Sequence, residues 1–249
     1  MKTCCFFVLL SVAVLLHLTG CQREHSPSTT IAVLCDVSEQ AFNDSAFYKK
    51  DIAALTWLIV HDPLKQDNGS GQLRLSALNA LSQNSVRTAT LPAVDAGFLG
   101  VNPYVRQDDV SEFEHDALDA FDAFGRTYRK DAGQSKIYQG LCNELTRLAS
   151  DPAKYKIMVV YSDFLENSAL FSLYPPENLK YLNDPVGFAD STLSRVCPLP
   201  SLDSITIYLV AYRNEKNDDT VNQALQFWKV ILVHRGAKVI IGADLTSML

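Results

Sequence analysis

The sequence lacks several features of nucleic-acid-binding proteins and of common enzyme classes. Its 22 Lys and Arg residues are outnumbered by 28 Asp and Glu, the formal net charge is −6, and the basic residues form no cluster. A glycine-rich loop that could cradle phosphates is absent, as is the Gly-x-Ser-x-Gly turn of many hydrolases. We therefore expect no nucleic-acid partner and find no support for these two kinds of catalytic site.

Cysteine is scarce outside the amino-terminal region. Three of the six cysteines, Cys4, Cys5 and Cys21, lie in or next to an apolar segment at the start of the chain. The other three have no metal-type spacing. We predict buried thiols at Cys35, in a strand, and at Cys142, on a helix. One disulfide with Cys197 stays open as the alternative if the compartment is oxidising.

Residues 1–20 have the pattern of a cleaved targeting signal. A short basic start precedes an apolar stretch at 4–16, which is too short for a comfortable permanent span. Residues 18–21, Leu-Thr-Gly-Cys, resemble the lipobox of bacterial lipoproteins. That resemblance implies cleavage before Cys21 and lipid attachment to its sulfur and new amino terminus. An ordinary secretory signal cleaved nearby is the alternative.

The region after the signal divides into a tether and one domain. Residues 21–29 are polar and aperiodic, which is typical of a flexible tether after the lipidated Cys21. Residues 30–249 are enough for one α/β domain with an ample core. Two or three acyl chains would anchor it stably in a membrane. Because Gln22 rather than Asp follows Cys21, the sorting rule of enteric bacteria implies the outer membrane, on its periplasmic or exterior face.

An apolar run at 31–35 predicts the central strand. All five residues are apolar and two are β-branched, which is typical of a strand buried in a parallel sheet. Asp36 and Ser38 follow directly. In open α/β sheets, ligands bind outside the carboxyl ends of the strands, so we expect both side chains at a binding edge.

The remaining patterns predict an α/β fold. Two runs joined by a short polar turn indicate a hairpin, whose second strand is antiparallel. The further strands are predicted at 72–80, 86–91, 156–161, 205–211 and 238–242, and the helices at 44–60, 110–130, 135–150 and 218–234. This alternation predicts a doubly wound, mainly parallel six-stranded sheet with helices on both faces and one antiparallel edge strand.

Two longer segments lack periodicity. Residues 92–107, which include Gly97, Gly100 and Pro103, are predicted to form a loop. Residues 167–204 are rich in Pro and Ser, and a segment of this size is usually functional or contains short helices. Its aromatic residues could shape binding specificity or could cover the sheet edge. They are Phe171, Tyr174, Tyr181 and Phe188.

Polar side chains follow three breaks that should meet at one edge of the sheet. They are Asp36 with Ser38, Ser135, and Asp163. Two carboxylates and two hydroxyls form an oxygen-rich set suited to a hard divalent cation such as Mg²⁺ or Ca²⁺. Alternatively, Ser135 is only a helix N-cap and Asp163 only braces a loop. Neither His nor Cys is placed for a zinc site.

Three segments resemble the motifs of the von Willebrand factor A domain. Residues 36–40 resemble Asp-x-Ser-x-Ser, with Gln40 at the last position. Residues 135–141 resemble Thr-x-Ile-x-x-Ala-Leu, with Ser for Thr and Gly for Ala. Residues 159–164, Val-Val-Tyr-Ser-Asp-Phe, resemble an apolar strand that ends in Ser-Asp-Gly, except at the Gly. The order of elements fits the same family over nearly all of residues 29–249.

The resemblance implies a metal-ion-dependent adhesion site. Its ligands would be Asp36, Ser38, Ser135 and Asp163, with Gln40 replacing a hydroxyl ligand. A cation held mainly by hydroxyls is short of negative charge, so an acidic side chain of a protein partner would complete its coordination. The implied function is a lipid-anchored, non-enzymatic binding module of the bacterial envelope.

Three other functions stay open. A degenerate domain could act as a metal-free scaffold subunit of an envelope complex. A solute-binding lipoprotein would usually need two lobes and a longer chain. An Asp36-dependent phosphoesterase of the haloacid dehalogenase type would need a second acid two residues after Asp36, where Ser38 stands.

Overall fold

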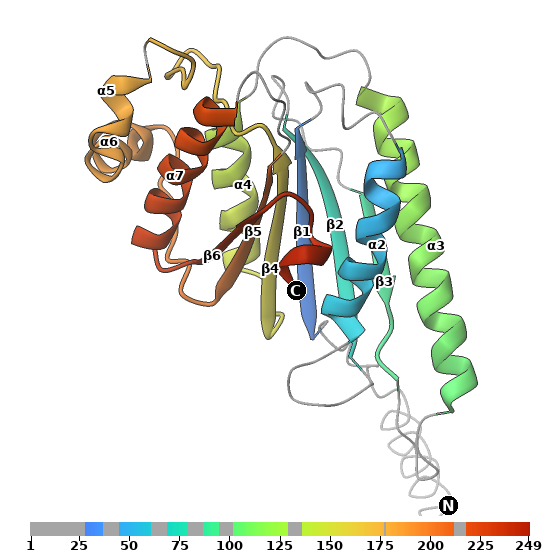
Figure 1. The fold of residues 1–249 in the computed structure, drawn as a ribbon. Coiled ribbons are helices and arrows are strands. Elements are labelled where there is room, and N and C mark those ends of the chain that lie inside the picture. Colours follow the sequence, from blue (N-terminus) through green and yellow to red (C-terminus); the bar gives the residue numbers. More distant parts are fainter. Residues whose placement is uncertain are drawn as a thin grey trace, which may run out of the picture.

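The fold is a six-stranded sheet covered by helices on both faces (Figure 1). The computed structural model describes residues 28–36, 45–60, 69–78, 87–94, 102–128, 136–176, 178–211 and 218–249. The strand order is β3-β2-β1-β4-β5-β6. The strands are β1 (Thr29–Asp36), β2 (Gly71–Leu78), β3 (Arg87–Leu91), β4 (Tyr155–Ser162), β5 (Ile205–Ala211) and β6 (Lys238–Gly242).

Strand pairing follows the predicted topology. β1 lies in the middle of the sheet and pairs in parallel with both β2 and β4, and β4, β5 and β6 continue the parallel set. β3 pairs antiparallel with β2 and forms one edge. The prediction of a mainly parallel six-stranded sheet with one antiparallel edge strand is therefore confirmed.

Helices form the two outer layers. The helices are α2 (Ser45–Val60), α3 (Pro103–Tyr128), α4 (Ile137–Ala149), α5 (Leu179–Leu182), α6 (Pro185–Ser191) and α7 (Asp218–His234), with 3-10 turns η2 (Leu193–Arg195) and η3 (Thr246–Met248). α2 and α3 pack in one hydrophobic cluster with one face of the sheet, and α4 and α7 pack in a second cluster with the other. None of the helices in the described ranges is long and apolar enough to cross a membrane.

The alternation of side chains along β1 explains the two clusters. Ile31, Val33 and Cys35 lie in the cluster with α2 and α3, whereas Ala32 and Leu34 lie in the cluster with α4 and α7. Successive strand residues point to opposite faces, so a strand covered on both sides must be apolar throughout. All five residues have no exposed surface.

Helix α3 begins earlier than the sequence pattern predicts. Residues 103–107 were expected in a loop, but α3 starts at Pro103. The Asn102 side chain accepts a hydrogen bond of 3.0 Å from the Tyr104 amide, and Pro103 occupies the first turn, where its missing N–H costs nothing. The apolar stripe that marks the helix starts only at Val110, because the first turns are largely exposed.

The segment between β4 and β5 contains short helices, which was one of the two alternatives predicted for residues 167–204. α5, α6 and η2 lie outside α7 (Figure 1). Three of its aromatic residues pack together: the Phe171 ring centroid lies 5.4 Å from Tyr181 and 5.2 Å from Phe188. Phe171 also approaches Phe227 of α7, with ring centroids 5.8 Å apart. Phe171 is therefore part of the core and Tyr181 and Phe188 are partly buried against it, while Tyr174 is 39% exposed.

A group of buried charges connects α4 to the sheet. Arg74 on β2 contacts Asp151 (Nη1 to Oδ2, 2.6 Å) and Glu144 on α4 (Nη2 to Oε1, 3.3 Å). The Thr30 hydroxyl donates to Asp151, and the Ser76 hydroxyl donates to Glu144. We call these five residues the Arg74 cluster. Each of its three charged side chains is at most 9% exposed, so the opposite charges compensate one another inside the fold.

Candidate functional site

Two of the predicted site residues lie at the carboxyl edge of neighbouring strands. Asp36 is the last residue of β1, and Asp163 directly follows the last residue of β4. The two strands are paired in parallel with Cys35 opposite Tyr161, so their ends lie side by side. The Ser162 hydroxyl donates a hydrogen bond of 2.8 Å to Asp36 Oδ2. Asp36 is completely buried and Asp163 is 8% exposed.

The loop after β4 is held by hydrogen bonds to its own side chains. Ser162 Oγ accepts from the Phe164 amide at 2.9 Å, and Asp163 Oδ1 accepts from the Leu165 amide at 2.9 Å. Trp228 Nε1 on α7 donates to the Phe164 carbonyl at 2.9 Å. Ser162 therefore links the end of β1 to this loop, and α7 holds the loop through the hydrogen bond from Trp228.

Phe164 occupies a backbone conformation that favours glycine. Its φ is +62°, in the left-handed region, where a side chain other than glycine is uncommon. It stands at the position where the von Willebrand factor A motif has Gly. The Phe164 side chain has no exposed surface and belongs to the α4 and α7 cluster, so its packing offsets the backbone cost.

The amino end of α4 is capped by a residue from the β4 loop. Lys136 is the N-cap residue and its side chain makes no capping hydrogen bond. Instead Glu166 Oε2 accepts a hydrogen bond of 2.8 Å from the Tyr138 amide, and the Glu166 carboxylate also accepts from the Ile137 amide. A carboxylate at a helix amino terminus satisfies unpaired N–H groups and interacts favourably with the helix dipole.

Burial determines the acidity of Glu166. This side chain is 1% exposed, and desolvation raises its pKa to about 7, from an ordinary value of 4.5. Hydrogen bonds from Ser168 and from the two helix amides lower the pKa, and the nearby Asp36 raises it. Desolvation exceeds the effect of these hydrogen bonds, so the carboxylate has less compensation than its charge requires.

Glu166 was not identified from the sequence. It follows Asp163 by three residues in a segment without periodicity, where an acid is normally exposed. Its burial depends on the amino end of α4, which lies 28 residues earlier in the chain. No local pattern in the sequence indicates this cap, because the acceptor for the first amides of α4 comes from a different segment of the chain.

The remaining predicted site residues lie outside the described residues. They are Ser38, Gln40, Ser135 and the proposed lipidation site Cys21. Within the described ranges, no three His, Cys, Asp or Glu side chains are grouped so that they could hold a metal ion. Asp36 and Asp163 offer only oxygen atoms, which fits a hard cation in donor type. The two expected hydroxyl ligands, Ser38 and Ser135, lie outside the described residues.

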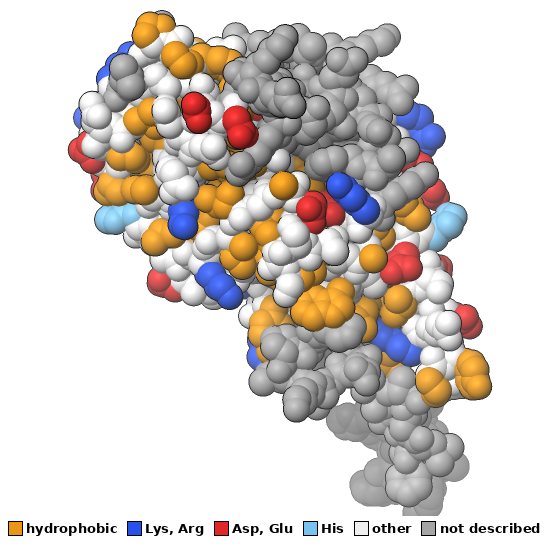
Figure 2. Space-filling view, viewed as in Figure 1, with side chains coloured by type: hydrophobic (Ala, Val, Ile, Leu, Met, Phe, Trp, Pro, Cys, Tyr) orange, Lys and Arg blue, Asp and Glu red, His pale blue; other side chains and the backbone are white. Residues whose placement is uncertain are grey.

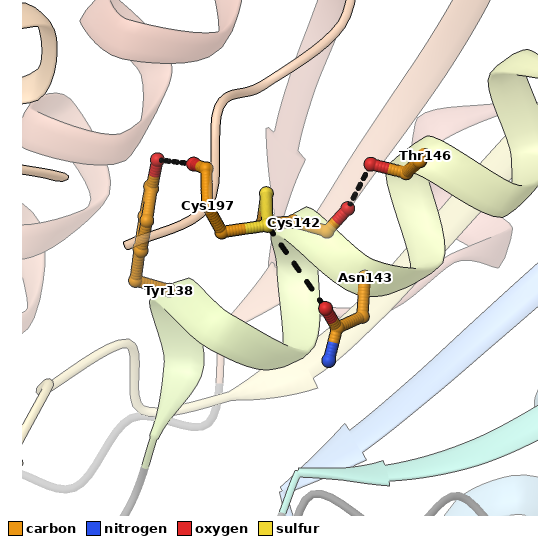
Figure 3. The surroundings of a disulfide bond; sticks show 5 residues. All are labelled: Tyr138, Cys142, Asn143, Thr146 and Cys197. Atoms are coloured by element: carbon orange, nitrogen blue, oxygen red, sulfur yellow. Dashed lines mark hydrogen bonds between the residues drawn. A yellow bond between two sulfur atoms is a disulfide. The ribbon is translucent and has the colours of Figure 1, made fainter. Parts of the chain in front are cut away.

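The cysteines differ from the prediction at one position. Cys142 on α4 forms a disulfide with Cys197, whereas a buried thiol was predicted there (Figure 3). The two are 55 residues apart, and the long segment after β4 folds back to bring Cys197 against α4. The Tyr138 hydroxyl donates to the Cys197 carbonyl at 2.5 Å and holds the same segment. Cys35 keeps its thiol and is completely buried, as predicted.

Comparisons with known proteins identify the fold. No family model matches the sequence, and no curated protein matches it. Among solved structures, the human COPII-coat protein Sec24c is similar over 89% of this chain and 30% of its own chain, with 13% identity and a TM-score of 0.50. This chain therefore spans less than a third of that protein, and the likeness concerns the fold alone.

Two bacterial structures give weaker similarity. An aerotolerance-related membrane protein from Bacteroides fragilis matches with a TM-score of 0.37 and 9% identity, over 88% of this chain and 94% of that one. The pilus adhesin SpaC from Lactobacillus rhamnosus GG matches with a TM-score of 0.44 and 11% identity, over 91% of this chain and 29% of that one. These two similarities are too weak to indicate a function. The strand order and the match to Sec24c establish that the chain has a von Willebrand factor A-like fold.

Proposed function

We propose that this protein is a lipid-anchored, non-enzymatic binding module of the bacterial envelope. Its binding surface would be the carboxyl edge of the sheet around Asp36 and Asp163. The observation that carries the proposal is the placement of these two buried acids at the ends of adjacent parallel strands, with Ser162 orienting Asp36. In open α/β folds this edge is where ligands bind.

A divalent cation such as Mg²⁺ fits the donor atoms at this edge. Asp36 and Asp163, together with Ser38 and Ser135, would hold it, and Gln40 stands where the family has a third hydroxyl. When bound, the cation would supply positive charge that an acidic residue of a protein partner could complete. Ser162 keeps the Asp36 carboxylate oriented, and the Leu165 amide does the same for Asp163.

The location of the module follows from the proposed lipidation of Cys21. The acyl chains would attach the domain to a membrane, and the part of the predicted tether that precedes Ser28 would let the carboxyl edge face a partner. An oxidising compartment such as the periplasm is where a disulfide like Cys142–Cys197 persists. The outer membrane, on its periplasmic or exterior face, is the proposed site.

A metal-free scaffold is the second candidate function, and a specific observation favours it. One oxygen of Asp36 and one of Asp163 already accept hydrogen bonds from protein groups, so the fold itself gives both acids structural partners. In that case the carboxyl edge would brace loops in an envelope complex and would require no cation.

Calorimetry of the full chain in mild detergent with Mg²⁺, Ca²⁺ or Mn²⁺ distinguishes the two functions. The binding module predicts heat and thermal stabilisation with at least one cation, both lost in Asp36→Asn. Asp119→Asn, an exposed change on α3, is the matched control and should bind as the wild type does. Neither heat nor stabilisation with any cation would favour the scaffold. If Asp36→Ala abolished a measured phosphatase turnover, the binding-module proposal would be wrong.

A further inference from the structure

A small cavity that is lined by a buried acid lies near the carboxyl edge. Its volume is about 180 Å³, and it lies between the start of α4 and the segment after β4. The residues used in the argument are Lys136, Glu166, Ser168, Ala169, Leu170 and Val196, which all line it. An apolar cavity of about 150 Å³ can hold benzene, so this one has room for a ligand of five or six heavy atoms.

The polar part of the cavity favours a cation. Glu166 is 1% exposed and accepts hydrogen bonds from two helix amides and from Ser168. An ionised carboxylate has about four acceptor positions, so these donors leave about one for a ligand. Burial without full compensation raises the pKa of Glu166 to about 7, and a bound cation would offset that cost.

The apolar part of the cavity favours an alkyl chain. Val196 is 46% exposed and Ala169 is exposed, so they form an apolar wall that is open to solvent, whereas Glu166 is buried. Leu170 is half-buried and continues that wall. A ligand with a short hydrocarbon stem and a charged head matches this order of surfaces.

The wall that carries Val196 is fixed covalently. Val196 precedes Cys197, which is bonded to Cys142 on α4, and the Tyr138 hydroxyl donates to the Cys197 carbonyl (Figure 3). Both sides of the cavity are thus attached to α4. Glu166 is attached by its hydrogen bond from the Tyr138 amide, and the wall with Val196 is attached by the disulfide. A cavity held in this way is preorganised, which lowers the cost of binding.

We propose that this cavity binds a primary alkylammonium group, with its stem against Val196 and Leu170 and its head on Glu166. Lys136 also lines the cavity, and we expect the site to select ligands that bring an apolar stem as well as a charge. The group could belong to a free amine or to a lysine side chain of a partner. The cavity does not require the cation proposed at Asp36.

Binding of alkylammonium ions to the full chain in mild detergent tests the proposal, followed by NMR or calorimetric titration. We expect methyl-, propyl- and butylammonium to bind with increasing affinity, by about fourfold for each buried methylene. Butanol, the neutral counterpart of butylammonium, should bind at least about tenfold more weakly, because hydrogen bonds to charged groups are the stronger ones. Equal affinity for butanol, or no binding of butylammonium, would overturn the proposal.

Variants locate the site. Glu166→Gln should weaken butylammonium binding at least about tenfold, whereas Glu112→Gln, the same change at an exposed position on α3, should not alter it. Retained affinity in Glu166→Gln would contradict the assignment. If that variant fails to fold, Val196→Ser keeps the test open, because it should remove most of the dependence on chain length. An unchanged dependence in Val196→Ser would equally count against the site.

Two further measurements separate the possible sources of binding. A larger hollow of about 330 Å³, lined by Leu182, Pro185, Phe227 and Val230, has no charged residue in its lining within the described ranges. Amine binding there would survive Glu166→Gln and refute the proposal. A capped Gly-Lys-Gly peptide that binds more tightly than butylammonium supports a partner's lysine as the ligand, and weaker binding supports a free amine. Absence of divalent-cation binding with butylammonium binding retained would count against the metal site alone, and the reverse result would count against this cavity alone.

Discussion

Two buried glutamates contact the same helix but are held in different ways. Glu144 and Glu166 are each 1% exposed, and burial raises the pKa of both. Glu144 lies within α4 and pairs with Arg74 and, at 3.6 Å, with Arg147. Glu166 lies at the start of α4 and accepts from backbone amides and a hydroxyl.

The difference separates a structural charge from one that is available to a ligand. Glu144 has the positive charges of Arg74 and Arg147 beside it, so the fold itself supplies its counter-charge, although its Oε1 atom makes no hydrogen bond. Glu166 accepts hydrogen bonds from dipolar groups, two backbone amides and a hydroxyl, and lines a cavity. On the face of the molecule seen in Figure 2, Lys and Arg side chains are scattered over the described part of the surface and form no broad patch.

Removing Arg74 should have the largest effect. Arg74→Met leaves Glu144 and Asp151 buried without their shared arginine, and we expect a loss of about 4 kcal/mol in the free energy of unfolding, measured with urea. Arg87→Met, at an exposed position of β3, should change it by less than about 0.5 kcal/mol. A loss below about 1 kcal/mol for Arg74→Met would show that the cluster does not depend on this arginine.

The pH dependence of stability should reveal Glu166 next. Its pKa is 4.5 in the unfolded chain and about 7 in the fold, so the folded state binds more protons between these values. Stability therefore falls as the pH rises from 4.5 to 7, by about 3 kcal/mol at 1.36 kcal/mol for each unit. Urea unfolding of Glu166→Gln should lack this part of the fall. Parallel profiles for the variant and the wild type would disprove the raised pKa.

Ser162→Ala should have the smallest effect of the three. It leaves Asp36 without one donor and the Phe164 amide without its acceptor, and we expect a loss of about 1 to 2 kcal/mol in thermal or urea unfolding. Ser201, whose hydroxyl donates to Asp203 on the surface, is the matched control, and Ser201→Ala should cost less than about 0.5 kcal/mol. Equal losses in the two variants would mean that burial does not strengthen the contact at Asp36.

The strands could be predicted from the sequence because burial on both faces leaves a continuous apolar run. Residues 31–35 and 156–161 fall inside β1 and β4, within one or two residues of each end. The start of α3 was missed because its first turns are largely exposed, so the apolar stripe begins later than the helix. Burial, rather than helix formation itself, produces the pattern that can be recognised.

The candidate site could be predicted only in part. Asp36 and Asp163 were recognisable because each directly follows an apolar strand, a relation that is local in sequence. The cap that Glu166 provides and the Cys142–Cys197 bond join residues 28 and 55 positions apart. Such contacts depend on how the long segment after β4 folds against α4. Neither periodicity nor spacing contains that information.

Phe164 has a consequence for how this fold is inherited. A loop that usually depends on the freedom of glycine is here maintained by a large side chain fixed in the core, with its carbonyl bound by Trp228. The shape of the loop and the residue that commonly marks it have become separable. A descendant chain can lose the motif and retain the geometry, provided that packing in the core offsets the backbone strain that glycine avoids.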